Sequence, residues 1–220
     1  MEGRMTGKQR LDRLSRYCQQ AEQCSGECRS WLEENCQEIL GKIKEELADT
    51  MEALQAQFEE LREAGEAGEL RYGFLSFLRT GVRGLGSWFR LDLYDDRERI
   101  SETECGKELE LSAALDPWRQ GIGSVWKELG RQSQVRDYEL EPLVFQLAEG
   151  YQKQVQGLLG EAMLSLLEES GEKWFGEGPA EIWQGEFMDQ AAFLCGWEQG
   201  GLVTEEEKDG REKERLAERD

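Results

Sequence analysis

The sequence of 220 residues contains no histidine. Histidine is the usual base of Ser-His-Asp and Cys-His catalytic groups, and it is a ligand in many zinc, ferritin-like di-iron and haem sites. Its absence excludes nucleophiles activated by histidine and metal or haem sites that depend on a histidine ligand. Any general base in this chain must therefore be a carboxylate, a lysine, a tyrosine or a cysteine.

Proline is scarce as well, with only three residues in the chain. This scarcity favours long uninterrupted helices over a sandwich of strands and turns. No apolar run approaches the roughly 20 residues that cross a bilayer, and the basic segment 1–16 lacks the apolar core of a signal peptide. We therefore expect a cytoplasmic protein with no membrane partner.

Acidic residues outnumber basic residues by 47 to 27, which gives a net charge of -20. The acidic residues are concentrated in 31–70 and 136–203, on either side of a balanced, arginine-rich centre. A nucleic-acid-binding protein needs a basic face to neutralise phosphates, so this charge argues against a nucleic-acid partner. The acidity serves solubility or suits a basic partner.

Amphipathic spacing predicts a helix over 8–24 and a long helix over 28–63, with a break at Ser25-Gly26. A helix as long as the second must pack on other helices, so pairing with a second copy of the chain stays open. Further helices are predicted at 71–79, 117–129, 141–169 and 179–194. An alternating segment, 88–94, predicts a strand that pairs with Leu109 and Leu111 as a hairpin.

These elements predict a mainly α fold. We expect a bundle of five to seven helices with one short strand or hairpin near 86–111. The bundle forms a single domain over 1–203, and 204–220 forms a charged, disordered tail.

Four cysteines lie close together in the sequence: Cys18, Cys24, Cys28 and Cys36. Four thiolates could hold a structural zinc ion or an iron–sulfur cluster. No Cys-x-x-Cys pair is present, however, and Cys18 and Cys36 fall at core positions of their helices. We therefore favour ordinary free thiols and leave a metal site as the alternative.

Acidic pairs raise the question of magnesium chemistry. Glu46 and Asp49 resemble the Glu-x-x-Asp half of the motif in MazG-like all-α nucleoside-triphosphate pyrophosphohydrolases. The resemblance implies nucleotide hydrolysis at a Mg²⁺ cluster, although the Glu-x-x-Glu half has no counterpart one helix earlier. Glu186 and Asp189 belong to a second set with suitable spacing. We favour solvated helix faces for both pairs, with no catalytic residue and no cofactor.

The segment 71–90 contains four arginines, no acidic residue and several aromatic residues. Such a mixture can stack on bases or anchor a protein interface, or its arginines can pair with acidic helices of the same chain. Tryptophans beside the glycine-rich segment 171–178 either cap the core or form a partner surface. The candidate partner-binding residues are Arg79, Arg83, Trp88, Arg90, Trp174, Phe175 and Trp183.

The sequence leads us to expect a non-enzymatic protein, namely an adaptor, regulatory or chaperone-like factor that binds a protein partner. The expectation depends on the absent catalytic constellation, the long amphipathic helix and the surplus of aromatic residues. Two alternatives stay open. One is a Mg²⁺-dependent nucleotide pyrophosphohydrolase, and the other is an acidic mimic of nucleic acid that inhibits a DNA-binding protein.

Overall fold

The computed structural model describes residues 7–84, 86–97, 105–130, 137–176, 178–187 and 189–205. Within these ranges the chain forms five helices and six strands. In chain order they are α1 (Gly7–Glu34), α2 (Cys36–Glu63), β1 (Tyr72–Phe77), α3 (Arg79–Gly84), β2 (Phe89–Tyr94), β3 (Gly106–Leu109), α4 (Ser112–Gly130), α5 (Asp137–Phe175), β4 (Ala180–Glu186), β5 (Ala191–Glu198) and β6 (Gly201–Val203).

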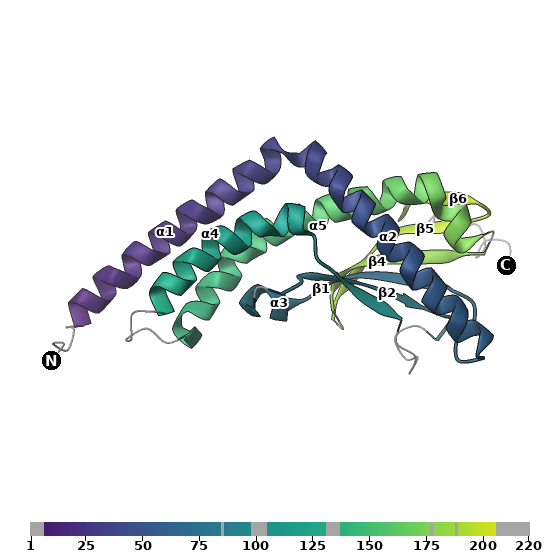
Figure 1. Ribbon diagram of the computed structural model, residues 1–220, viewed down its shortest axis with the longest axis horizontal. Coiled ribbons are helices and arrows are strands. Elements are labelled where there is room, and N and C mark those ends of the chain that lie inside the picture. The colour runs from purple at the N-terminus through teal and green to yellow at the C-terminus, as the bar shows by residue number, and fades with distance from the viewer. Residues whose placement is uncertain are drawn as a thin grey trace, which may run out of the picture.

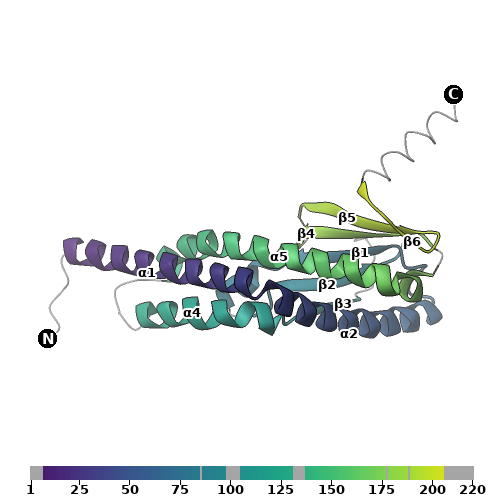
Figure 2. The same cartoon turned by 90° about the horizontal axis from the view of Figure 1, so that it is seen from above.

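The strands form one mixed sheet in the order β3-β2-β1-β4-β5-β6. The central strands β1 and β4 run parallel, with Tyr72 beside Glu181 and Phe77 beside Glu186. The other neighbouring strands are antiparallel. Figures 1 and 2 show α2 and the C-terminal half of α5 lying along one face of this sheet. No helix of the described ranges covers the opposite face.

The main core lies between the sheet and these two helices. Alternate strand residues face the helices, and four of them, Leu75, Leu91, Leu93 and Ile182, are at most 1 % exposed. They share one apolar cluster with the stripe of α2 and with buried residues of α5. The α2 stripe is Ile39, Ile43, Leu47, Met51, Leu54 and Phe58. Burial of each large side chain contributes about 1.5–3 kcal/mol, so this layer supplies much of the stability.

A second group of helices extends beyond the sheet. Figure 1 shows α1, α4 and the N-terminal half of α5 projecting to the left of the strands. Three aromatic rings join this projection to the sheet. Trp118 stacks on Tyr151 with ring centroids 5.0 Å apart, and Trp88 meets these rings edge-on at 5.5 and 6.2 Å. The Tyr151 hydroxyl donates a hydrogen bond to the carbonyl oxygen of Ala114.

The predicted start near 8 and end at 63 agree with α1 and α2, but the predicted boundary between the two helices is wrong. Helix α1 runs through Ser25-Gly26, because a glycine inside a long helix costs only about 1 kcal/mol. The break lies instead at Asn35, whose ψ of 14° departs from helical geometry. The Asn35 side-chain amide donates to the carbonyl oxygen of Trp31 at 2.8 Å, in addition to the backbone N–H of Asn35, which donates to the same oxygen at 3.1 Å.

The predicted fold class is also wrong. A mainly α (all-alpha) helical bundle was expected, but the chain has an α/β fold with a six-stranded sheet. Segment 71–79 forms β1 and segment 179–194 forms most of β4 and β5, although both were predicted as helices. Their apolar residues satisfy a helical period, but cross-strand pairing over a long sequence separation decides the structure.

Other predicted elements are confirmed. Helices 117–129 and 141–169 lie within α4 and α5. Strand 88–94 corresponds to β2, and Leu109 pairs with Phe89 as predicted, although this hairpin is one side of the larger sheet. The predicted tail lies outside the described residues from 206 onward. Among the described helices, none has the length and apolar character needed to cross a membrane.

Candidate binding face

The sheet face turned away from α2 and α5 carries a row of aromatic side chains, and we call it the open face. Strand alternation places on it Tyr72 and Phe74 of β1, Arg90, Asp92 and Tyr94 of β2, and Glu181 and Trp183 of β4. A register shift between Ile182 and Trp183 brings Phe193 of β5 to the same face as Gly196 and Glu198. The register aligns Asp92, Phe74, Trp183 and Phe193 in one row across four strands.

The aromatic rings of the open face contact one another in two groups. Phe74 lies edge-on to Tyr94 at 5.6 Å and also contacts Tyr72, with ring centroids 6.5 Å apart. Trp183 lies edge-on to Phe193 at 5.6 Å. Phe74 is 8 % exposed because its neighbours cover it, whereas the other four rings are half-buried. Partly exposed Tyr and Trp on rigid strands are typical of protein-binding hot spots.

An arginine–aspartate pair occupies the β2 side of the open face. The Arg90 Nε lies 2.6 Å from Asp92 Oδ1, and Asp92 is only 2 % exposed. Gly106 of β3 makes room for the pair, since a Cβ there would lie 1.9 Å from Asp92 Oδ1. The Arg90 guanidinium also lies 5.6 Å from the ring centroid of Phe187, whose side chain is 40 % exposed. The positive charge of Arg90 is thus balanced within the face.

At the β5 side, the open face contains a cavity of about 330 Å³, which we call the hollow. Gly196 lies between Glu181 of β4 and Val203 of β6 in the register, and its lack of a side chain leaves this space. Tyr72 and Phe193 line it with their rings. Its charged lining residues are Asp96, Glu181, Glu198 and Arg71. The hollow is therefore aromatic and predominantly acidic.

A larger groove of about 780 Å³ lies between α5, the start of α3 and the β4–β5 turn. It brings together three residues predicted from the sequence, Arg79, Glu186 and Asp189. Arg79 Nε lies 3.3 Å from Glu186 Oε2, but the Arg79 side chain is 70 % exposed, so the ion pair is largely screened. Several glutamines complete the lining. Phe77, Val82, Phe145 and Ala148 also line it, so the groove is mixed in character.

The structure separates the other predicted binding residues. Arg90 and Trp183 lie on the open face, on strands that flank β1. Trp88 and Trp174 are 1 % and 5 % exposed and belong to the core, where a partner cannot contact them. Phe175 is half-buried at the end of α5. Arg83 lies in α3, and its side chain lies outside the described part of the structure.

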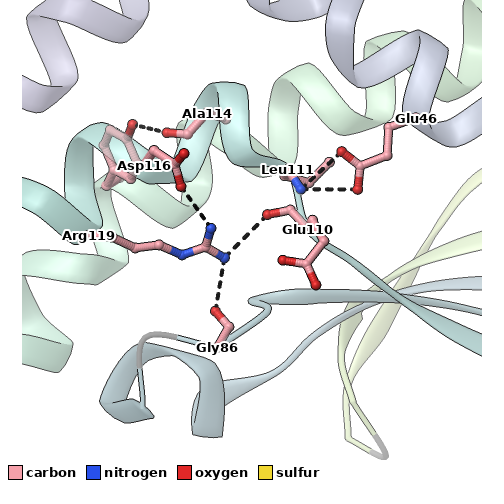
Figure 3. Close-up of polar contacts among 8 residues, drawn as sticks. Glu46, Gly86, Glu110, Leu111, Ala114, Asp116 and Arg119 are labelled. Atoms are coloured by element: carbon pink, nitrogen blue, oxygen red, sulfur yellow. Dashed lines mark hydrogen bonds and ion pairs between the residues drawn. The ribbon is translucent and has the colours of Figure 1, made fainter.

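The carboxylate of Glu46 is engaged at the start of α4 (Figure 3). Both of its oxygens accept a hydrogen bond from the backbone N–H of Leu111 at 3.1 Å. Nearby, Arg119 donates to Asp116 and to the carbonyl oxygens of Gly86 and Glu110, which fixes the same junction (Figure 3). Asp49 is exposed one turn further along α2. Glu46 thus has a structural partner of its own.

Metal ligands do not converge in the described ranges, where no group of three His, Cys, Asp or Glu residues could hold an ion. The six cysteines are free thiols in the structure. Cys24 and Cys28 face Gly121 of α4, where an added Cβ would lie 2.4 Å from Cys24 Sγ. Burial raises the pKa of the Cys28 thiol to about 12, helped by neighbouring Cys24 and Glu27. Such thiols are poor ligands and poor nucleophiles near neutral pH.

The sequence prediction missed Tyr72, Phe74, Tyr94 and Phe193 as members of a shared surface. The assignment of 71–79 and 179–194 to helices placed Tyr72, Phe74 and Phe193 on the wrong type of element. The sequence did contain one indication of a hairpin, the pair Gln199-Gly200. These two residues form the turn between β5 and β6, with φ values of 55° and 75°. A Gly at that position flanked by apolar segments is typical of a β-hairpin.

Comparisons with known proteins identify no relative: no family model, no curated protein and no solved structure matches this chain.

Proposed function

We propose that this chain is a non-enzymatic interaction protein whose open face binds a basic segment of another protein. The observation that carries the proposal is the row of half-buried aromatic rings on a sheet face that no described helix covers. The strands fix these rings in place before binding. A rigid surface loses little conformational entropy when a partner docks on it.

The rings supply the apolar part of the binding energy. Tyr72, Tyr94, Trp183 and Phe193 each retain exposed area that a partner would cover. Burial of apolar surface contributes about 25 cal/mol per Å², and rings that are already ordered keep most of this gain. Tyr and Trp also offer polar atoms at their rims, which suits contact with a peptide backbone.

The charge of the chain selects a basic partner. The net charge of -20 attracts cationic segments over long range and raises their association rate. On the open face itself Arg90 is paired with Asp92, and the lining of the hollow contains three carboxylates and one arginine. Binding is therefore expected to weaken as salt rises, without disappearing, because the aromatic contacts are insensitive to screening.

The test uses the full chain and a fluorescent 15-residue peptide in which Lys and Arg alternate with Ala and Tyr. A peptide with Glu at the basic positions is the charge control. We expect anisotropy to detect only the basic peptide. Hydroxyl-radical footprinting should show protection of Tyr72, Tyr94, Trp183 and Phe193 in the complex.

Two tryptophan variants complete the test. Trp183→Ala removes a half-buried ring from the open face, and Trp31→Ala removes a half-buried ring from α1. We expect Trp183→Ala to weaken binding at least tenfold and Trp31→Ala to leave it unchanged. Equal affinity for both variants, with binding abolished by moderate salt, would instead indicate an acidic surface that binds by charge alone and would overturn the proposal.

A further inference from the structure

We propose that the groove between α5, α3 and the β4–β5 turn binds an extended, uncharged segment of a partner polypeptide. This second site is separate from the open face and from the basic segment proposed to bind there. Each of the two sites can therefore be present without the other.

The groove lies where the strand order of the sheet changes direction. Strands β1 and β4 are parallel neighbours, so their carboxyl ends, Phe77 and Glu186, lie side by side. The chain leaves β1 toward β2 and leaves β4 toward β5, on opposite sides of this pair. Figure 1 shows α3, which follows β1, at this end of the sheet. Diverging connections leave a crevice outside the strand ends, and open α/β sheets bind ligands in such crevices.

One wall of the groove is a stripe of α5 that extends from Phe145 to Gln156. Its lining residues Phe145, Ala148, Gln152 and Gln156 are three or four positions apart, so they share one face of the helix. At 1.5 Å per residue this wall is about 16 Å long. A chain in the extended conformation covers that length with about five residues. The wall therefore suits an extended segment better than a compact small molecule.

The charged residues of the groove form pairs of opposite sign. Arg79 contacts Glu186 at 3.3 Å, and Lys153 contacts Glu149 at 2.7 Å. The fifth charged residue of the described lining is Asp189, in the turn after β4. A single charge on the ligand would meet its own sign beside the opposite sign and would gain little. The lining thus favours an uncharged segment.

Glutamine side chains supply polar groups that match a peptide backbone. Gln152 Nε2 donates to Gln156 Oε1 at 2.5 Å, which leaves Gln152 Oε1 as an acceptor and Gln156 Nε2 as a donor. Gln146 of α5 and Gln190 of the β4–β5 turn also line the groove, and both are exposed. Each side-chain amide offers donors and an acceptor, as does the backbone of every residue except proline. The groove can therefore bond a backbone of any uncharged sequence.

Apolar residues of the lining offer a contact for one large side chain. Phe77 and Val82 are 7 % and 5 % exposed, whereas Phe145 is half-buried. Phe145 retains ring area that a ligand would cover, and burial of this area is favourable. We therefore expect the bound segment to contain one aromatic or large aliphatic residue.

The test selects ligands for the full chain from a phage-displayed library of random seven-residue peptides. High salt during selection suppresses peptides that bind by charge alone. We expect enrichment of uncharged peptides with one large apolar residue. Hydroxyl-radical footprinting with the most enriched peptide should show protection of Phe145 and no protection of Trp183.

Variants at exposed positions locate the site without disturbing the core. The double variant Gln146→Ala/Gln190→Ala removes two exposed amides from the groove, and Gln20→Ala removes an exposed amide from α1 as the control. We expect the double variant to bind the selected peptide at least tenfold more weakly. Gln20→Ala and Trp183→Ala should bind it as wild type does.

Three outcomes would overturn the inference. The first is a library that yields no enriched peptide, and the second is an enriched peptide that binds the double variant as tightly as wild type. The third is loss of binding in Trp183→Ala, which would assign the selected peptides to the open face.

Discussion

Both carboxylate oxygens of Glu46 lie 3.1 Å from the backbone nitrogen of Leu111, across the junction between α2 and the start of α4. Leu111 has a φ of 43°, which is uncommon for a residue with a branched side chain. The Leu111 side chain is 1 % exposed, so this strained backbone conformation places the leucine in the core. The charged acceptor on α2 offsets this strain.

Replacement of Glu46 should therefore destabilise the fold. Glu46→Ala leaves the Leu111 N–H without its acceptor and is expected to lower the free energy of unfolding by about 1–3 kcal/mol. Urea denaturation measures the change. Asp49→Ala, at an exposed position on the same helix, is the control and should change stability by less than about 0.5 kcal/mol. Similar losses in both variants would contradict this role.

Gly106 should be indispensable beside the Arg90–Asp92 pair. In Gly106→Ala the new Cβ would lie 1.9 Å from Asp92 Oδ1 and 2.5 Å from Arg90 Nη2. The pair must shift, and we expect a loss of about 1–3 kcal/mol. Gly157→Ala in α5 meets no atom within 4 Å and should instead stabilise by about 0.5–1 kcal/mol. Thermal melting of the two variants compares them directly.

Asp95 should make stability sensitive to acid. Burial alone would raise the pKa of this carboxyl, but hydrogen bonds from Arg97 and from the backbone N–H of Gly68 lower it overall. Because the native pKa is lowered, the stabilisation is fully present above the unfolded pKa of about 4. It is lost as the pH falls through the lower native value.

The variant Asp95→Asn isolates this contribution. Urea denaturation at pH 7 should show it to be less stable than wild type by about 1–3 kcal/mol. The difference should shrink as the pH is lowered below about 4, because wild type then loses the charge as well. A difference that stays constant over this range would show that the charge of Asp95 does not stabilise the fold.

Cysteine reactivity should follow burial. Burial raises the pKa of the Cys105 thiol to about 11 and that of Cys195 to about 12, so little thiolate forms at pH 8. Cys18 and Cys36 are half-exposed. Iodoacetamide at pH 8, followed by peptide mapping, should label Cys18 and Cys36 well before Cys105 and Cys195. In concentrated urea the rates should converge, and early labelling of Cys195 in the native protein would contradict the structure.

The sequence predicted the elements whose patterns are local. The apolar stripes of α4 and α5 have the helical period, and Phe89, Leu91 and Leu93 alternate with polar residues in β2. Strand β1 has apolar or small residues on both faces, Tyr72 and Phe74 on one and Leu75 and Phe77 on the other, so it shows no polar alternation. A short apolar run of this kind is equally consistent with a buried helix.

The candidate site was less predictable for the same reason. Arg90 and Trp183 were named from composition, but β1 lies between their strands and brings them to one face, which no local pattern indicates. Gly196 has no side chain, so the sequence alone does not mark it as part of a binding surface. Its importance appears only when Glu181 and Val203 are placed on either side of it. Register, a long-range property, defines the open face and the hollow.

The pairing of β1 with β4 also affects how the chain folds during its synthesis. Arg79 and Glu186, which follow β1 and end β4, are 107 positions apart in the sequence. During synthesis β1 leaves the ribosome long before its parallel neighbour exists, and it waits with one edge unpaired. Contacts of this separation slow folding, because a long loop must close first. Nascent chains that stop before β4 are therefore expected to be the form most prone to aggregate.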